Sequence, residues 1–269
     1  MRHLLAATFV ILTALPLWAN ARHTVLMDVL RIAELSEILH SEGIAFGSTL
    51  DRDWLDGQGG PSWSVQVARI YDPARISEAI RAGLEPALEG PLLEETITFF
   101  ATDPGAQIIT LENAARRALA DEAIETETRA RFAALDGSDD PRLAQIERMI
   151  EAGDLVNRNV TSALNANFQF LRALVDGDVY LMTEEEILTD VMAERDAIAQ
   201  DTRGWLGAFM LLAYSPLTLE ELTAYADFAT GEAGRALNTG LFAGFDPLYG
   251  DISYALGRAM ARSMAAEEL

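Results

Sequence analysis

The side chains that could act as nucleophiles, bases or metal ligands are few in this sequence. It contains no cysteine and no lysine, and beyond the first twenty residues its histidines are His23 and His40. Such a chain offers no thiol nucleophile, no Schiff-base amine and no phosphate-loop lysine. The two histidines do not form a pair at helical spacing, which disfavours a zinc site or a histidine base. We therefore predict no catalytic, cofactor-binding or metal-binding residue of these types.

Two groups of aspartates, in the ranges 51–57 and 176–178, partly match a calcium-binding loop. Such a loop needs a glycine at its sixth position and a glutamate at its twelfth. Counted from Asp51, the twelfth position is Ser62, and counted from Asp176, the sixth is Leu181. We interpret both groups as solvated turns.

Carboxylate chemistry remains possible, because some glycosidases work with glutamate and aspartate alone. The best placed pairs are Glu94 with Glu95 and Glu220 with Glu221. All four stand in the first turn of an expected helix, where a carboxylate caps free N–H groups and interacts favourably with the helix dipole. Capping is the interpretation that we prefer, and hydrolysis of a cell-wall glycan is the alternative.

A run rich in aromatic and methionine side chains is the best candidate for a binding groove. It comprises Trp205, Phe209, Met210 and Tyr214. Side chains of these types at helical spacing more often fill a protein core than line a groove. Replacing Trp205 and Phe209 by alanine distinguishes the two roles, since loss of partner binding indicates a groove and unfolding indicates a core.

The elements that must position these residues are helices. Apolar residues recur at helical spacing, and no alternating run typical of a strand occurs. The pattern predicts an all-α fold, an irregular bundle of about nine to ten helices. Among the expected helices are 24–42, 104–135, 141–152, 155–175, 183–213, 219–230, 232–242 and a last helix from Asp246. The expected N-caps are Thr24 for 24–42, Asp103 for 104–135 and Asp154 for 155–175. Gly43 is expected to end the first of these helices.

Two segments have the same order of landmarks, 90–106 and 214–235. In each, a Pro-Leu pair and a glutamate pair precede a phenylalanine, and a glycine follows the phenylalanine six residues later: Phe99 with Gly105, and Phe228 with Gly234. Each segment predicts a helix, a tight turn and another helix. The distances from proline to phenylalanine differ by four residues, so chance similarity and a true duplication into two similar helical lobes both remain open.

The second segment resembles a known family. Its residues Thr218, Glu220, Glu221, Leu222, Tyr225, Phe228, Ala233 and Gly234 are similar to the motif of the bacterial domain-of-unknown-function 2059 family, over about 183–264. Where that family has an aromatic residue after the phenylalanine, this chain has Ala229. The resemblance implies an exported, all-helical protein of Gram-negative bacteria and implies no functional residue.

The chain begins like a secretion signal. Arg2 and His3 precede the apolar run 4–18, and 19–21 has the small-x-small form of a cleavage site, so we expect cleavage after Ala21 and a periplasmic location. We further expect an N-terminal lobe over 22–136, a hinge at 137–141 and a C-terminal lobe over 142–269. No later segment has the length and apolarity of a membrane span.

The charge balance limits the partners that we expect. The formal net charge is −22, and every basic residue other than histidine is arginine. An acidic surface repels phosphate backbones, which disfavours nucleic acid as a partner. We expect a non-enzymatic binding or interaction module in the periplasm, with a protein or peptide as its partner. Four asparagines in 155–175 suggest either a wet face or a dimer interface, so the oligomeric state stays open.

Overall fold

A computed structural model describes residues 15–267, and the regular structure within that range is entirely helical. The helices are α1 (Leu15–Val29), α2 (Ile32–Trp54), α3 (Gly60–Ile70), α4 (Pro73–Ala87), α5 (Gly90–Phe100), α6 (Gly105–Ala118), α7 (Glu122–Leu135), α8 (Pro141–Ala152), α9 (Leu155–Val175), α10 (Glu184–Ala193), α11 (Arg195–Tyr214), α12 (Leu219–Thr230) and α13 (Glu232–Glu267). The predicted all-α bundle is confirmed, with more helices in the described range than the nine or ten expected.

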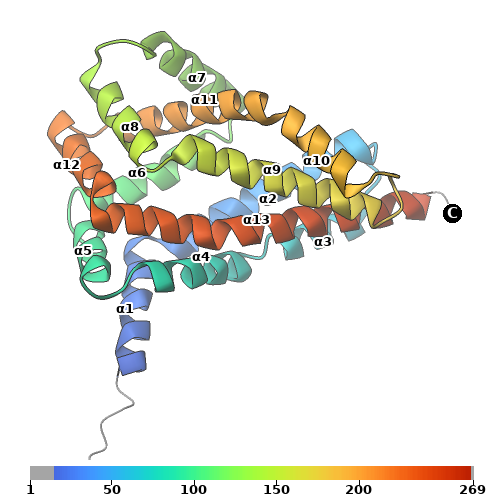
Figure 1. The fold of residues 1–269 in the computed structure, drawn as a ribbon, viewed down its shortest axis with the longest axis horizontal. Coiled ribbons are helices and arrows are strands. Elements are labelled where there is room, and N and C mark those ends of the chain that lie inside the picture. The colour runs from blue at the N-terminus through green and yellow to red at the C-terminus, as the bar shows by residue number, and fades with distance from the viewer. Residues whose placement is uncertain (1–14, 268–269) are drawn as a thin grey trace, which may run out of the picture.

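The longest helix, α13, runs along most of the molecule and packs most extensively against α9 and α4 (Figure 1). On the other side of α9, α11 packs against α6 and α7. The short helices α5, α8 and α12 lie together at the left-hand end in Figure 1. This end contains both of the segments with matching landmarks.

The buried apolar residues form two clusters, which we name core 1 and core 2. Core 1 joins residues such as Leu26 and Ile80 to Leu256 of α13. Core 2 joins residues such as Phe132 of α7 to Leu211 of α11. Each core therefore contains residues from both sides of 137–141, so the boundary expected there does not separate two cores.

Local capping signals are confirmed where they are strongest. Thr183 with Glu186, and Thr218 with Glu221, form capping boxes. In each pair the threonine hydroxyl accepts a hydrogen bond from the backbone N–H of the glutamate, and the glutamate carboxylate accepts one from the backbone N–H of the threonine. These reciprocal bonds satisfy N–H groups that the first turn of a helix leaves unpaired. Helices α8, α9 and α12 have the predicted bounds, and nearby capping residues specify the starts of α8 and α12.

The expected helix 24–42 is wrong at both ends. Thr24 lies inside α1, and the chain breaks at Arg31, whose φ of 49° is left-handed. Gly43 does not stop α2, which continues to Trp54. A Cβ at position 43 would clash with the ring of Tyr71, so this glycine permits close packing of α2 on the end of α3.

Two long helices of the prediction are each broken in the structure. The expected helix 104–135 divides into α6 and α7, and Asp121 caps α7 by accepting the N–H groups of Ala123 and Ile124. The expected helix 183–213 divides at Glu194 into α10 and α11. The predicted caps Asp103 and Asp154 make no capping bond; α6 begins after Pro104, and Asp154 is left-handed.

The opposite error occurs near the C-terminus, where two expected helices form one. Pro247 lies inside α13 instead of opening a new helix. Proline in a helix interior costs about 3 kcal/mol. Close packing offsets that cost, since Gly240 and Gly244 of α13 lie directly against the backbone of Gly83 in α4.

Most of the predicted secretion signal lies outside the described residues. Helix α1 begins at Leu15 and continues through Ala21, the predicted cleavage position. Export therefore stays a prediction.

Among the residues that the structure describes, no helix combines the length and the apolarity needed to cross a bilayer.

Candidate functional site

The two segments with matching landmarks meet inside the protein. Phe99 of α5 and Phe228 of α12 stack with their ring centroids 4.1 Å apart and their planes 9° apart. The glycine six residues after each phenylalanine has the same role, because a Cβ on Gly105 or on Gly234 would clash with the carbonyl oxygen of that phenylalanine. Both glycines thus lie close to the carbonyl oxygen of their phenylalanine, although residues 101–104 separate α5 from α6 and only Gly231 separates α12 from α13. The stacked phenylalanines join the two segments.

A cavity of about 220 Å³, partly open to solvent, lies beside this stack. It is formed where core 1 meets core 2, since Phe228 and Leu237 belong to the first and Met149 and Leu206 to the second. The lining residues come from α6, α8, α9, α11, α12, α13 and the turn between α8 and α9: Glu112, Met149, Gly153, Leu155, Leu206, Phe209, Met210, Tyr214, Tyr225, Phe228, Ala229, Gly234, Leu237, Asn238 and Leu241.

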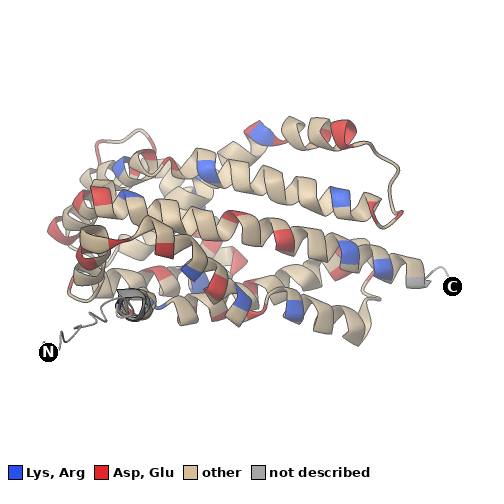
Figure 2. Ribbon diagram, turned by 60° about the horizontal axis from the view of Figure 1, so that its bottom comes forward, with Lys and Arg blue, Asp and Glu red and all other residues tan. Residues whose placement is uncertain are grey.

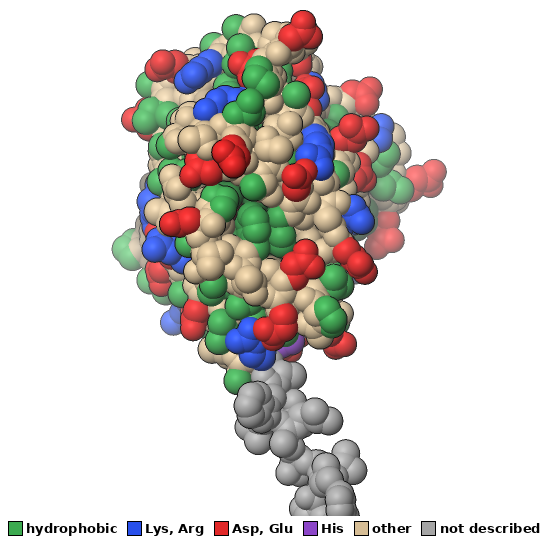
Figure 3. Space-filling view, turned by 90° about the vertical axis from the view of Figure 1, so that its left-hand side faces the viewer, with side chains coloured by type: hydrophobic (Ala, Val, Ile, Leu, Met, Phe, Trp, Pro, Cys, Tyr) green, Lys and Arg blue, Asp and Glu red, His purple; other side chains and the backbone are tan. Residues whose placement is uncertain are grey.

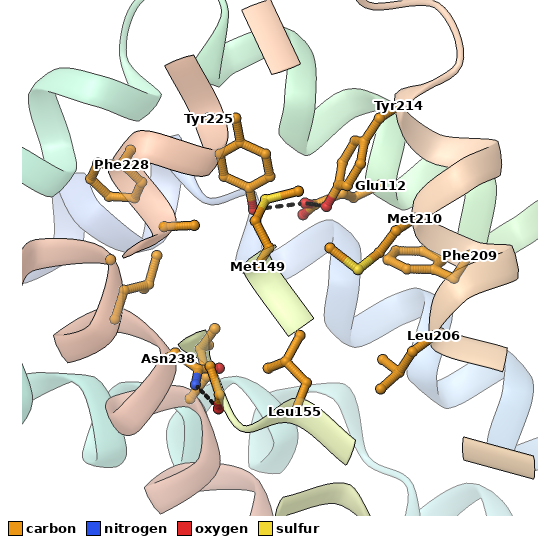
Figure 4. A pocket seen from close by; sticks show the side chains of 15 residues that line it. Glu112, Met149, Leu155, Leu206, Phe209, Met210, Tyr214, Tyr225, Phe228 and Asn238 are labelled. Atoms are coloured by element: carbon orange, nitrogen blue, oxygen red, sulfur yellow. Dashed lines mark hydrogen bonds between the residues drawn. The ribbon is translucent and has the colours of Figure 1, made fainter. Parts of the chain in front are cut away.

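One carboxyl group, that of Glu112, lies on the wall of this cavity. Its Oε1 accepts a hydrogen bond of 2.7 Å from the hydroxyl of Tyr214 and one of 3.0 Å from the hydroxyl of Tyr225 (Figure 4). Within the described chain, Oε2 makes no side-chain hydrogen bond. Both tyrosines therefore point at a single oxygen and leave the other available.

The surroundings change the acid–base behaviour of all three groups. Burial raises the pKa of the Glu112 carboxyl above its ordinary value, and the two tyrosine hydroxyls offset part of that rise. Burial, together with the nearby carboxyl, raises the pKa of Tyr214 and of Tyr225 well above the usual range. The tyrosines stay protonated and act as donors, while Glu112 holds its proton more tightly than a solvated glutamate.

Neighbouring contacts fix the position of the tyrosines. Arg142 of α8 donates to the carbonyl oxygens of Tyr214, at 3.3 Å, and Leu217, at 2.6 Å, and so holds the turn between α11 and α12. A cation at this place also suits the partial negative charge of a helix C-terminus. The ring of Phe99 stacks on that of Tyr225 at 6.0 Å.

The far end of the cavity carries a second polar contact. Asn238 of α13 donates a hydrogen bond of 3.0 Å to the carbonyl oxygen of Gly153, in the turn between α8 and α9. In Figure 4 Asn238 lies away from Glu112, with Met149 between them and Leu155 beside Asn238. The cavity thus has an apolar middle and a carboxyl at one end.

The predicted aromatic and methionine run divides between lining and support. Phe209, Met210 and Tyr214 line the cavity, whereas Trp205 lies behind Phe209, with ring centroids 5.3 Å apart and nearly parallel planes. The guanidinium of Arg116 lies over the Trp205 ring at 5.9 Å. Arg116 also makes a two-pronged ion pair with Glu42, at 2.7 and 2.8 Å, which ties α6 to α2.

The carboxylates singled out from the sequence lie outside this cavity. Glu221 is a capping residue, as predicted. Glu94 is not: it forms an ion pair with Arg22 of α1, and that arginine holds the pKa of Glu94 below its usual range. Glu95 and Glu220 are exposed. The structure therefore places none of these four residues on the cavity wall.

The two histidines bond to backbone carbonyls. A ring nitrogen of His23 lies 2.9 Å from the carbonyl oxygen of Leu88, and one of His40 lies 2.8 Å from that of Tyr71. Within residues 15–267, no group of three histidine, cysteine, aspartate or glutamate side chains is arranged to hold a metal ion.

Sequence reasoning missed Glu112, although a signal for it was present. Glu112 follows Ile108 by four residues and precedes Ala115 by three, so it stands on the apolar face of its helix. A lone carboxylate at such a position is either paired, neutral or functional.

Larger hollows than this cavity exist on the protein, such as one of about 660 Å³ between α4 and α13. That hollow is more open to solvent, and the charged residues that line it are exposed.

Comparison of this chain with protein-family models, with curated proteins and with solved structures finds no match, so its resemblance to the domain-of-unknown-function 2059 family stays a prediction.

Proposed function

We propose that this chain is a non-enzymatic, exported binding protein whose ligand is a small and largely apolar molecule. The observation that carries the proposal is the cavity beside the Phe99–Phe228 stack, with apolar walls and the Glu112 carboxyl at one end. Apolar concave sites with a few convergent polar groups and a perturbed pKa are the usual form of a ligand site. Export rests on the sequence features of residues 1–21.

The size of the cavity favours a small molecule over the protein or peptide partner expected from the sequence. Cavities of about 150 Å³ lined by apolar residues bind benzene. A volume of about 220 Å³ accommodates a somewhat larger molecule, on the order of ten non-hydrogen atoms. A peptide of several residues needs more room.

The alternative, a carboxylate-only hydrolase, needs two acids that face one cleft. Glu112 has the raised pKa of a general acid, but it is the one carboxyl among the residues that line this cavity. The arrangement supports binding better than hydrolysis of a glycan.

Filling the cavity tests the proposal. Ala229 of α12 lines the cavity, whereas Ala224 of the same helix is exposed. Ala229→Leu and Ala224→Leu therefore form a matched pair that adds the same side chain inside and outside the cavity. The probe is 2-phenylethanol, a neutral molecule of suitable size, and the measurement is the melting temperature at increasing probe concentration.

We expect the probe to stabilise the wild type and Ala224→Leu equally, by about 1.4 kcal/mol at ten times the dissociation constant. Ala229→Leu should show little or no such gain, because the added side chain takes the space of the ligand. An equal gain in all three proteins places binding elsewhere and contradicts the proposal, as does the absence of a gain in any of them.

A further inference from the structure

We propose that the cavity selects a cationic head group, so that its ligand is a small apolar amine whose ammonium group binds Glu112. This inference rests on the proposed binding function and adds the chemical class of the ligand. Three features of the site carry it: the free oxygen of Glu112, the aromatic side chains around it, and the lack of a basic side chain among the residues that line the cavity.

The first feature is unused hydrogen-bond capacity. A carboxylate offers about four acceptor positions and no donor when it is ionised. Tyr214 and Tyr225 donate to Oε1 alone. The remaining positions, chiefly on Oε2, can accept from a ligand donor, and no other lining side chain competes for them because these side chains are apolar except for Asn238. Asn238 donates to the carbonyl oxygen of Gly153 instead.

The second feature is the group of aromatic side chains that line the cavity. Phe209, Tyr214, Tyr225 and Phe228 all line the cavity. The face of an aromatic ring attracts a cation within about 6 Å of its centre, and the attraction grows when the cation is removed from water. Figure 4 shows Tyr214 and Tyr225 on either side of the Glu112 carboxyl. An ammonium at this end of the cavity has a carboxylate and aromatic side chains as neighbours.

The third feature is charge. No arginine lines the cavity, so an anionic head group would face Glu112 without a counter-ion. The formal net charge of the chain is −22. Acidic residues gather at the left-hand end of the molecule in Figure 2, and in Figure 3 acidic side chains surround hydrophobic ones on that end. Such a field attracts cations and repels carboxylates and phosphates.

Three probes of similar size test the inference on the unaltered protein by isothermal titration calorimetry. They are 2-phenylethylamine, 2-phenylethanol and phenylacetate, which carry a cationic, a neutral and an anionic head group. We expect the amine to bind about tenfold more tightly than the alcohol, because a hydrogen bond between two charged groups is stronger than one to a neutral hydroxyl. Phenylacetate should bind most weakly.

A proton balance gives a second readout. The ammonium binds ionised Glu112, so amine affinity should rise as the pH rises through the pKa of this carboxyl in the free protein. Below that pKa, each amine bound should release one proton, which calorimetry detects as a dependence of the heat on the ionisation enthalpy of the buffer. Binding of the alcohol should release none.

Glu112→Gln keeps the shape of the side chain and removes its charge. This variant should lose the preference for the amine over the alcohol, while Glu95→Gln, at an exposed position of α5, should keep that preference as in the wild type. Equal binding of amine and alcohol by the wild type, or tighter binding of phenylacetate, overturns the ammonium inference and leaves the binding function standing. Failure of all three probes to bind overturns both.

Discussion

Phe99 and Phe228, which stand 129 positions apart in the chain, stack face to face with ring centroids 4.1 Å apart. Each is followed six residues later by a glycine whose backbone lies against the phenylalanine carbonyl. The helix after the first glycine, α6, carries Glu112, and the helix before the second, α12, carries Tyr225. The contact between the two phenylalanines thus fixes where the carboxyl and its hydrogen-bond donor meet.

The stack itself should show measurable coupling. Phe99→Leu and Phe228→Leu should each lower the free energy of unfolding by about 1 to 3 kcal/mol. The double variant should lose less than the sum of the two, by about 0.5 to 1.5 kcal/mol, because the ring contact is lost only once. Urea denaturation of the four proteins measures the coupling.

The control for this cycle pairs Phe228→Leu with Phe46→Leu, since Phe46 is 49% exposed and makes no ring contact within the described chain. That pair should be additive. Additivity of the Phe99 and Phe228 substitutions as well would mean that the stack does not join the two segments.

The turn glycines should not accept a side chain. Gly105→Ala and Gly234→Ala each place a Cβ against a carbonyl oxygen of the preceding helix, so each should cost at least about 2 kcal/mol of unfolding free energy. Gly204→Ala in α11 is the control. There the added Cβ meets only the end of the flexible Arg129 side chain, and alanine in a helix is favoured over glycine by up to about 1 kcal/mol. Equal melting temperatures for all three variants would contradict the described turns.

The raised pKa of Glu112 gives a dependence of stability on pH with a definite sign. A carboxyl whose pKa is higher in the folded than in the unfolded state binds its proton more tightly when folded. Its contribution to stability is therefore full below the unfolded pKa of about 4.3 and declines as the pH rises to the raised value, by up to about 1.4 kcal/mol per pH unit. Glu112→Gln does not titrate, so the unfolding free energy of the wild type should fall relative to that of this variant across the window.

A second variant separates this effect from general changes in packing. The hydroxyl of Tyr225 lowers the pKa of Glu112, so Tyr225→Phe should raise that pKa further and extend the decline to higher pH. Chemical denaturation at a series of pH values measures both differences. A difference between the wild type and Glu112→Gln that is constant with pH would show that Glu112 titrates alike in the folded and unfolded states.

The parts of the fold that the sequence predicts correctly are those with local causes. The start of α8 follows from Asp140, which accepts the N–H groups of Arg142 and Leu143, and the start of α12 from the capping box of Thr218 and Glu221. The errors have causes distant in the chain. Gly43 appeared to end a helix because the residues next to it in the sequence do not reveal its contact with Tyr71. Pro247 appeared to begin a helix because the packing of α13 on α4, which accommodates this proline, is not visible in the local sequence.

The candidate site could be predicted only in part, for a similar reason. The aromatic run 205–214 pointed to one wall of the cavity. The chemistry of the site depends on pairs separated by 102 and 113 positions, Glu112 with Tyr214 and with Tyr225. Helical periodicity places each residue on an inner face, but only the tertiary arrangement of α6, α11 and α12 brings them together.

The most direct test of the cavity as a ligand site uses the methionines as reporters. Met149 and Met210 line the cavity, whereas Met27 and Met260 are buried in core 1 and do not. With ¹³C-methyl methionine, a titration with 2-phenylethanol followed by NMR should shift the methyl signals of Met149 and Met210 in a saturable way and leave those of Met27 and Met260 in place. Unchanged Met149 and Met210 signals at high probe concentration, or equal shifts of all four, would contradict the account.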